Sequence, residues 1–266
     1  MNEPDTAPRL AAIDTATDTL AVAVVVGPRQ WCAQELGGAR SSQRVLPVLT
    51  ALLAQAGVQP AALEGVAFGR GPGAFTGLRT ACSVAQGFAL GAGCPVLSID
   101  SLMIVADDMR ARHGIAELWV AMDARMDEVY AGAYAFDGMR WHVRVQPALY
   151  TLAALNAAWQ VQAPQALAGS AVLAFGDRLA CGGAHRLGEE GADRAAALAR
   201  LSRAAWHRGE ALDAALALPL YLRDKVALTT AERACVRAAR EAREAREAQD
   251  ALDARAGPHA REAAGR

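Results

Sequence analysis

The chain reads Gly69-Arg70-Gly71-Pro72-Gly73-Ala74-Phe75-Thr76-Gly77-Leu78-Arg79 between an apolar stretch and a segment rich in small residues. Glycine has no Cβ, so this backbone can approach a ligand or another backbone more closely than other residues allow. The preceding residues 65–68 predict a short buried strand, and Thr76 can cap a helix that continues to about Leu90. The stretch therefore predicts a strand, a glycine-rich loop and a helix in direct succession.

Two interpretations of this loop stay open on the residues alone. A glycine-rich turn before a helix N-terminus is the usual geometry for binding phosphate, because free helix N–H groups point outward there. The spacing, however, fits neither the P-loop nor the dinucleotide-binding pattern. The other interpretation is a tight turn that lets the helix pack closely on the sheet.

The composition of the chain excludes several classes of protein. The 266 residues are 53% apolar, enough for a substantial core, and 27 basic residues face 28 acidic ones for a net charge of −1. A chain that binds nucleic acid unaided usually carries a basic excess, so we expect any contact with nucleic acid to depend on a partner. The five cysteines form no Cys-x-x-Cys pair, and no long uncharged apolar run or basic leader appears. These features predict a reduced, cytoplasmic protein with no membrane span and no zinc site.

The order of the predicted elements repeats. Strand patterns at residues 10–14, 20–26 and 31–36 precede a helix, a strand and a second helix, and a second strand triplet begins near residue 118. This order predicts an α/β fold of two related lobes, each a mixed sheet flanked by helices. The expected divisions are a loose N-terminus (1–8), a first lobe (9–110), a second lobe (111–230) that includes a helix near 193–209, and a tail (231–266). The tail, rich in Ala, Arg and Glu, is expected to be a frayed helix or disordered.

Candidate binding residues lie at the ends of predicted strands. Asp14 and Thr15 follow the first strand, where a carboxylate and a hydroxyl can face a nucleotide phosphate and its magnesium, with Gly71 and Gly73 completing a weak nucleotide cleft. Alternatively, these side chains bond to the backbone of their own turn. The turn at residues 123–128 of the second lobe allows the same two interpretations.

Catalytic constellations do not stand out in the sequence. The five histidines include no His-x-x-x-His pair, and no Gly-x-Ser-x-Gly elbow is present. We therefore predict no catalytic residue and no metal ligand in this chain.

Four segments, at residues 10–17, 69–79, 123–130 and 219–223, together resemble the TsaB (YeaZ) family, in order from about residue 9 to 227. The resemblance implies two actin-like (ASKHA, ribonuclease H-like) lobes. It also implies a cytoplasmic role in forming N6-threonylcarbamoyladenosine at position 37 of tRNAs that read ANN codons.

In that family the TsaB member is implied to be a non-catalytic scaffold that pairs with its paralogue TsaD, or with itself, and works with the ATPase TsaE. No cofactor is then required by this chain, although ATP or ADP is possible at the level of the complex. TsaD carries metal-binding histidines on its first helix, whereas this chain reads Ser41-Ser42-Gln43-Arg44 at that place.

The resemblance also implies pairing through the helices at residues 41–55 and 76–90. The first of these has an apolar set too wide for one face, which fits a partner contact or ordinary internal packing equally well. A charge at Leu49 or Ala85 is expected to break the pairing and leave the fold intact. The expected contact residues are Val45, Leu49, Leu52, Leu78, Cys82 and Ala85.

Two alternatives differ in kind from a scaffold. One is an autonomous ATPase or protease-like enzyme that uses the Asp14 cleft, which loss of function in an Asp14 variant with intact assembly would favour. The other is an independent tRNA-binding module, which the balanced charge disfavours.

Overall fold

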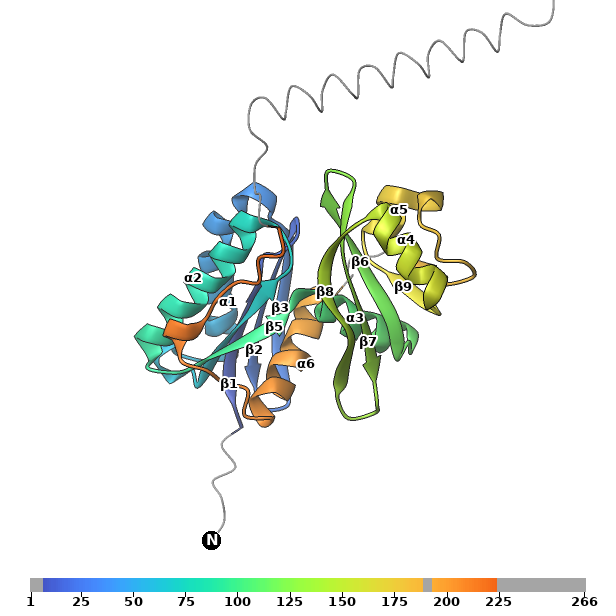
Figure 1. Ribbon diagram of the computed structural model, residues 1–266. Coiled ribbons are helices and arrows are strands. Elements are labelled where there is room, and N and C mark those ends of the chain that lie inside the picture. The colour runs from blue at the N-terminus through green and yellow to red at the C-terminus, as the bar shows by residue number, and fades with distance from the viewer. Residues whose placement is uncertain (1–6, 189–192, 224–266) are drawn as a thin grey trace, which may run out of the picture. The chain divides into compact units, whose positions relative to one another are not determined.

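The structure is a computed structural model that describes residues 7–188 and 193–223 (Figure 1). It contains two five-stranded sheets, ordered β3-β2-β1-β4-β5 and β10-β9-β6-β7-β8. Within each sheet, the first three strands in chain order pair antiparallel and the last two join in parallel. The two sheets therefore share one topology, which confirms the predicted α/β fold of two related lobes, each a mixed sheet flanked by helices.

The elements have the following bounds. The first group comprises β1 (Arg9–Asp14), β2 (Thr19–Val26), β3 (Arg29–Leu36), α1 (Ser41–Ala56), β4 (Gly65–Gly71), α2 (Phe75–Ala92), β5 (Val96–Asp100) and α3 (Ser101–His113). The second comprises β6 (Glu117–Arg125), β7 (Glu128–Phe136), β8 (Trp141–Thr151), α4 (Leu152–Val161), β9 (Ala166–Ala168), α5 (Ala171–Phe175), β10 (His185–Leu187) and α6 (Arg194–His207).

The central strands of the first sheet are apolar on both faces because helices cover both. Successive side chains of a strand point to opposite faces. Accordingly, Ala11 and Ile13 of β1 pack in the core beneath α1 and α2, whereas Leu10 and Ala12 pack against α6. A strand buried on both faces reads as a continuous apolar run, as β1 does.

Two helices pack on the sheet of the other lobe from the one that the expected division at residue 110 assigns them to. Helix α6, which we expected in the second lobe, packs on the first sheet, with Leu198 and Leu201 in its core cluster. Helix α3, which we expected in the first lobe, places Leu102 and Met109 in a core cluster of the second sheet. The apolar second face of each sheet needs a covering helix, and the chain supplies it by crossing over twice; α3 and α6 contact each other.

Other expectations concern the ends of the chain and membranes. The predicted tail at 231–266 and most of the predicted loose N-terminus lie outside the described residues. Within the described ranges, no helix is long and apolar enough to cross a membrane.

Candidate functional site

The carboxylate of Asp14, one of the residues of the predicted weak nucleotide cleft, is fully buried at the end of β1. Its Oδ2 forms an ion pair with Nη2 of Arg194. Its Oδ1 accepts a hydrogen bond from Ser101 Oγ at 3.1 Å and another from the Ala16 amide at 3.3 Å. Both carboxylate oxygens of Asp14 are therefore engaged by the protein itself.

Arg194 reaches Asp14 from the first turn of α6. The helix is capped by Asp193, whose Oδ1 accepts from the Ala196 amide at 3.1 Å. A cation in the first turn of a helix opposes the helix dipole, so Arg194 needs a compensating anion, and Asp14 provides it. Sequence reasoning missed this residue, although a basic residue directly after an N-cap aspartate was an available signal.

The glycine-rich loop packs against the turn that follows β1. Thr15 Oγ1 donates to the Gly77 carbonyl at 2.6 Å, and the Ala74 amide donates to the Ala16 carbonyl at 2.7 Å. A Cβ at Gly77 would overlap the Thr15 carbonyl, and one at Gly73 would overlap that of Ala16. These contacts support the tight-turn interpretation, in which glycines allow α2 to approach the sheet.

The structure brings the four predicted nucleotide-cleft residues close together, but it uses them for internal contacts. Gly71 donates its amide to Ser101 Oγ at 3.1 Å, and a Cβ there would touch the Leu220 carbonyl. With Asp14 paired to Arg194 and the hydroxyl of Thr15 bonded to the loop, the residues present do not fit a bound nucleotide phosphate at this place.

The corresponding turn of the second lobe also bonds to its own backbone. Asp123 Oδ1 accepts from the Arg125 amide at 2.8 Å, and the Asp123 amide donates to Ser170 Oγ at 3.0 Å. Arg125 in turn pairs with Asp18 at 3.5 Å, so the two strand-end turns are joined by an exposed ion pair. No group of three or more potential metal ligands (His, Cys, Asp or Glu) occurs within residues 7–188 and 193–223.

The six expected contact residues do not face outward. All are buried within the chain itself and belong to its core or lie against it: Val45, Leu49, Leu52, Leu78, Cys82 and Ala85. The assignment was wrong because the wide apolar set of α1 left the rotation of the helix ambiguous. A charge at Leu49 or Ala85 would therefore enter the core and unfold the protein.

The outward faces of α1 and α2 carry a different set of residues. On α1 they include Leu46, Pro47, Thr50 and Ala54, and on α2 they include Thr76, Ser83, Gly87 and Leu90. Leu90 is 82% exposed. Another helix can approach such a surface closely, because most of its side chains are small and its exposed leucines are isolated. The outward faces of α1 and α2 therefore remain candidates for a contact surface.

The segment after α6 extends this surface across α2. Gln86 Nε2 donates to the Ala214 carbonyl at 2.9 Å, and the ring of Tyr221 packs 5.0 Å from that of Phe75. Leu216 and Leu218 of the same segment are 68% and 73% exposed. Sequence reasoning missed both leucines, because their exposure depends on a crossing that no local pattern shows.

Comparisons with known proteins agree with this architecture. A family model described as "TsaD: tRNA N6-adenosine threonylcarbamoyltransferase" matches residues 35–181. A solved structure of an uncharacterized Pseudomonas aeruginosa protein "with similarity to peptidase YEAZ" is 34% identical with a TM-score of 0.73, and the match covers 81% of this chain and all of the other. The chain belongs to the TsaB/YeaZ family. A second structure, YeaZ from Pseudomonas aeruginosa, is 33% identical with a TM-score of 0.72 and coverages of 80% and 100%.

Two curated relatives of this TsaB/YeaZ chain carry the name tRNA threonylcarbamoyladenosine biosynthesis protein TsaB. The protein from Escherichia coli K12 is 38% identical over 136 residues, which are 50% of this chain and 58% of the relative. That from Haemophilus influenzae is 38% identical over 121 residues, or 46% and 51%. The matched region therefore spans about half the length of the curated relatives.

Proposed function

We propose that this chain is a non-catalytic, activating subunit of the complex that forms N6-threonylcarbamoyladenosine at position 37 of tRNAs that read ANN codons. The observation that carries the proposal is the buried Asp14–Arg194 ion pair in a TsaB/YeaZ chain. Because the Asp14 carboxylate is paired with Arg194, it is not available to a bound nucleotide, as an enzyme that used the Asp14 cleft would require. A scaffold, in contrast, needs only a folded chain with a surface that binds its partners.

The proposed partners are a TsaD-like paralogue and a TsaE-like ATPase, with tRNA bound only through the complex and a homodimer as the alternative pairing. The outward faces of α1 and α2, extended by Leu216 and Leu218, are the proposed contact surface. A paralogue is a suitable occupant because it would present equivalent helices.

Reconstitution tests the activating role. We expect threonylcarbamoyl transfer from threonylcarbamoyl-adenylate to tRNA by purified TsaD and TsaE to appear only when this chain is added, and none from this chain alone. Transfer that is unaffected by the chain, while TsaD and TsaE bind each other normally, would contradict the proposal. Activity from the chain alone would favour the enzyme alternative.

A charge on the proposed surface is expected to abolish co-elution with the TsaD-like partner. Leu90→Glu places a carboxylate at an 82% exposed position of α2, so the fold should stay intact while at least tenfold of partner affinity is lost. The measurement is size-exclusion chromatography with a binding titration. Leu173→Glu is the matched control, because Leu173 is 78% exposed on α5, away from these helices. Equal affinity of the two variants would contradict the assigned surface.

A further inference from the structure

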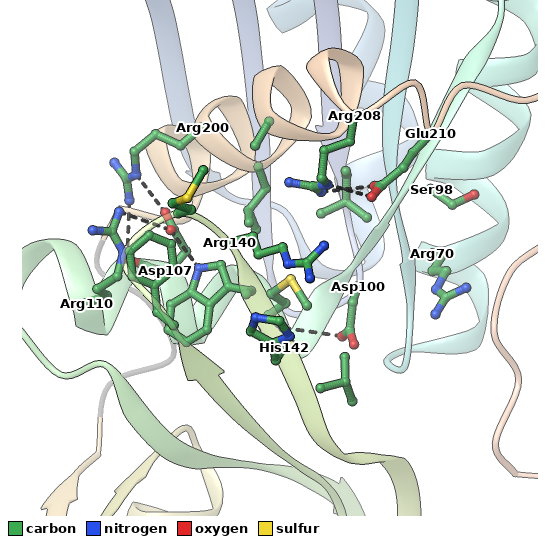
Figure 2. Close-up of a pocket in the computed structure, with 18 residues that line it drawn as sticks. Arg70, Ser98, Asp100, Asp107, Arg110, Arg140, His142, Arg200, Arg208 and Glu210 are labelled. Carbon is green, nitrogen blue, oxygen red and sulfur yellow. Dashed lines mark hydrogen bonds and ion pairs between the residues drawn. The ribbon is translucent and has the colours of Figure 1, made fainter.

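A cavity of about 700 Å³ lies between the edge of the first sheet and the β7–β8 hairpin (Figure 2). Its walls come from the C-terminal end of β5, from α3 and α6, and from the hairpin residues around Arg140. The residues lining it do not include Asp14, Thr15, Gly71 or Gly73. The cavity is therefore separate from the strand-end turns described above.

The lining of the cavity is strongly basic. Five arginines and three carboxylates line it: Arg70, Arg110, Arg140, Arg200, Arg208, Asp100, Asp107 and Glu210. This leaves an excess of two positive charges in a chain whose net charge is −1. A cleft with an excess of one sign of charge and low-dielectric walls attracts ions of the opposite sign.

The carboxylates of the cavity are occupied by other groups. Asp107 accepts from Arg200 Nε at 2.6 Å, from Arg110 Nη2 at 3.4 Å and from Trp141 Nε1 at 3.0 Å. Glu210 forms a two-bond ion pair with Arg208, at 2.6 and 3.0 Å. These bonds join the elements that form the walls, and they pair Asp107 and Glu210 with three of the five arginines.

The third carboxylate, Asp100, is directed toward the interior. It accepts from Tyr134 Oη at 2.9 Å and from the amide of Leu102 at 2.8 Å at the start of α3. Burial raises the pKa of Asp100, while the Tyr134 bond and the charge of Arg70 oppose that rise. Asp100 thus serves as the N-cap of α3, and within the part of the chain that the structure describes it makes no hydrogen bond to Arg70.

Arg70 and Arg140 are the two cavity arginines that no carboxylate holds by a hydrogen bond within the described residues. Nε of Arg70 is buried and has no hydrogen-bond partner there. The Arg140 side chain is 62% exposed, and its Nε lies 3.9 Å from Asp137, too far for a hydrogen bond. Asp137 is engaged by His142 at 2.6 Å. Figure 2 shows both guanidinium groups among the side chains that line the cavity.

We propose that this cavity binds a small phosphorylated ligand, with Arg70 and Arg140 as the phosphate-binding residues. The planar fork of arginine matches phosphate oxygens and binds them in bidentate fashion. The volume lies within the usual range for small-molecule sites, roughly 300–1,000 Å³. Apolar lining residues, including Met103, Phe136 and Leu201, offer a surface for the rest of the ligand. The inference does not depend on the proposed scaffold function.

Isothermal titration of the full chain with inorganic pyrophosphate, and separately with ATP, tests the inference. We expect saturable 1:1 binding that weakens as salt is added, and at least a tenfold loss of affinity in Arg140→Glu. Arg144→Glu is the matched control, because Arg144 is an exposed arginine on β8, the strand that begins just after Arg140, but it does not line the cavity. Its affinity should stay within twofold of the wild type.

The two ligands distinguish the sources of the phosphate. Equal affinities would mean that the phosphates alone are recognised, and tighter binding of ATP would mean that the apolar wall contributes; either supports the site. No saturable binding of either ligand, or the same loss in Arg140→Glu and Arg144→Glu, would overturn it. A third titration, with tRNA, covers the remaining source: binding of tRNA but of neither small ligand, abolished by Arg140→Glu, would also overturn the proposal by assigning the surface to nucleic acid. Thermal unfolding of each variant confirms that the fold is kept.

Discussion

Replacing Arg194 by methionine is expected to lower the free energy of unfolding by about 3–5 kcal/mol, because it leaves the Asp14 carboxylate buried without its cation. Asp14 and the Arg194 side chain are 0% and 1% exposed, so water cannot take over the lost interaction. Urea denaturation monitored by circular dichroism measures this loss.

Two further variants separate the ion pair from general effects of losing an arginine. Arg178→Met removes an exposed partner of Asp127, for which we expect a loss of about 0–1 kcal/mol. The double variant Asp14→Leu with Arg194→Met removes both charges and is expected to recover much of the stability lost in Arg194→Met. A loss below about 1 kcal/mol in Arg194→Met would contradict the assigned role of the pair.

Gly77→Ala is expected to destabilise the protein by about 3 kcal/mol, because its Cβ would overlap the carbonyl oxygen of Thr15 and force α2 away from the sheet. The displacement would also weaken the hydrogen bond from Thr15 Oγ1 to the Gly77 carbonyl. The free energy of unfolding by chemical denaturation is again the measurement.

Gly87→Ala provides the control on the same helix. A Cβ at Gly87 would meet nothing within 4 Å, so the substitution should raise the free energy of unfolding by about 1 kcal/mol through helix propensity. If Gly77→Ala were equally harmless, the close packing of the loop on the turn after β1 would not hold.

The losses of stability expected in Arg194→Met and Gly77→Ala both come from contacts around the end of β1. The Asp14–Arg194 pair joins β1 to α6, and Gly77 brings α2 onto the turn after β1. Both use residues near the predicted nucleotide cleft to hold elements of the fold together. Loss of function in an Asp14 variant would therefore need a stability measurement beside it before it could favour the enzyme alternative.

Local patterns in the sequence predicted much of the fold. The apolar runs of β1 and β2, the glycine-rich loop and the repeated strand triplet all depend on residues near one another in the chain, and the structure confirms the elements they predict. The sequence also grouped Asp14, Thr15, Gly71 and Gly73 as a weak nucleotide cleft; the structure places them close together, because β1 and β4 pair in parallel, but uses them for internal contacts.

The sequence by itself determined the succession of elements and the two repeated sheets, because side-chain periodicity and glycine placement act over a few residues. Tertiary structure alone decided which face of α1 is inside, that α3 and α6 exchange sheets, and that Arg194 meets Asp14 across 180 residues. It also brought Arg70 and Arg140 to one cavity. These features depend on which apolar faces bury each other, and this choice is made by the whole chain when it packs rather than by any local segment.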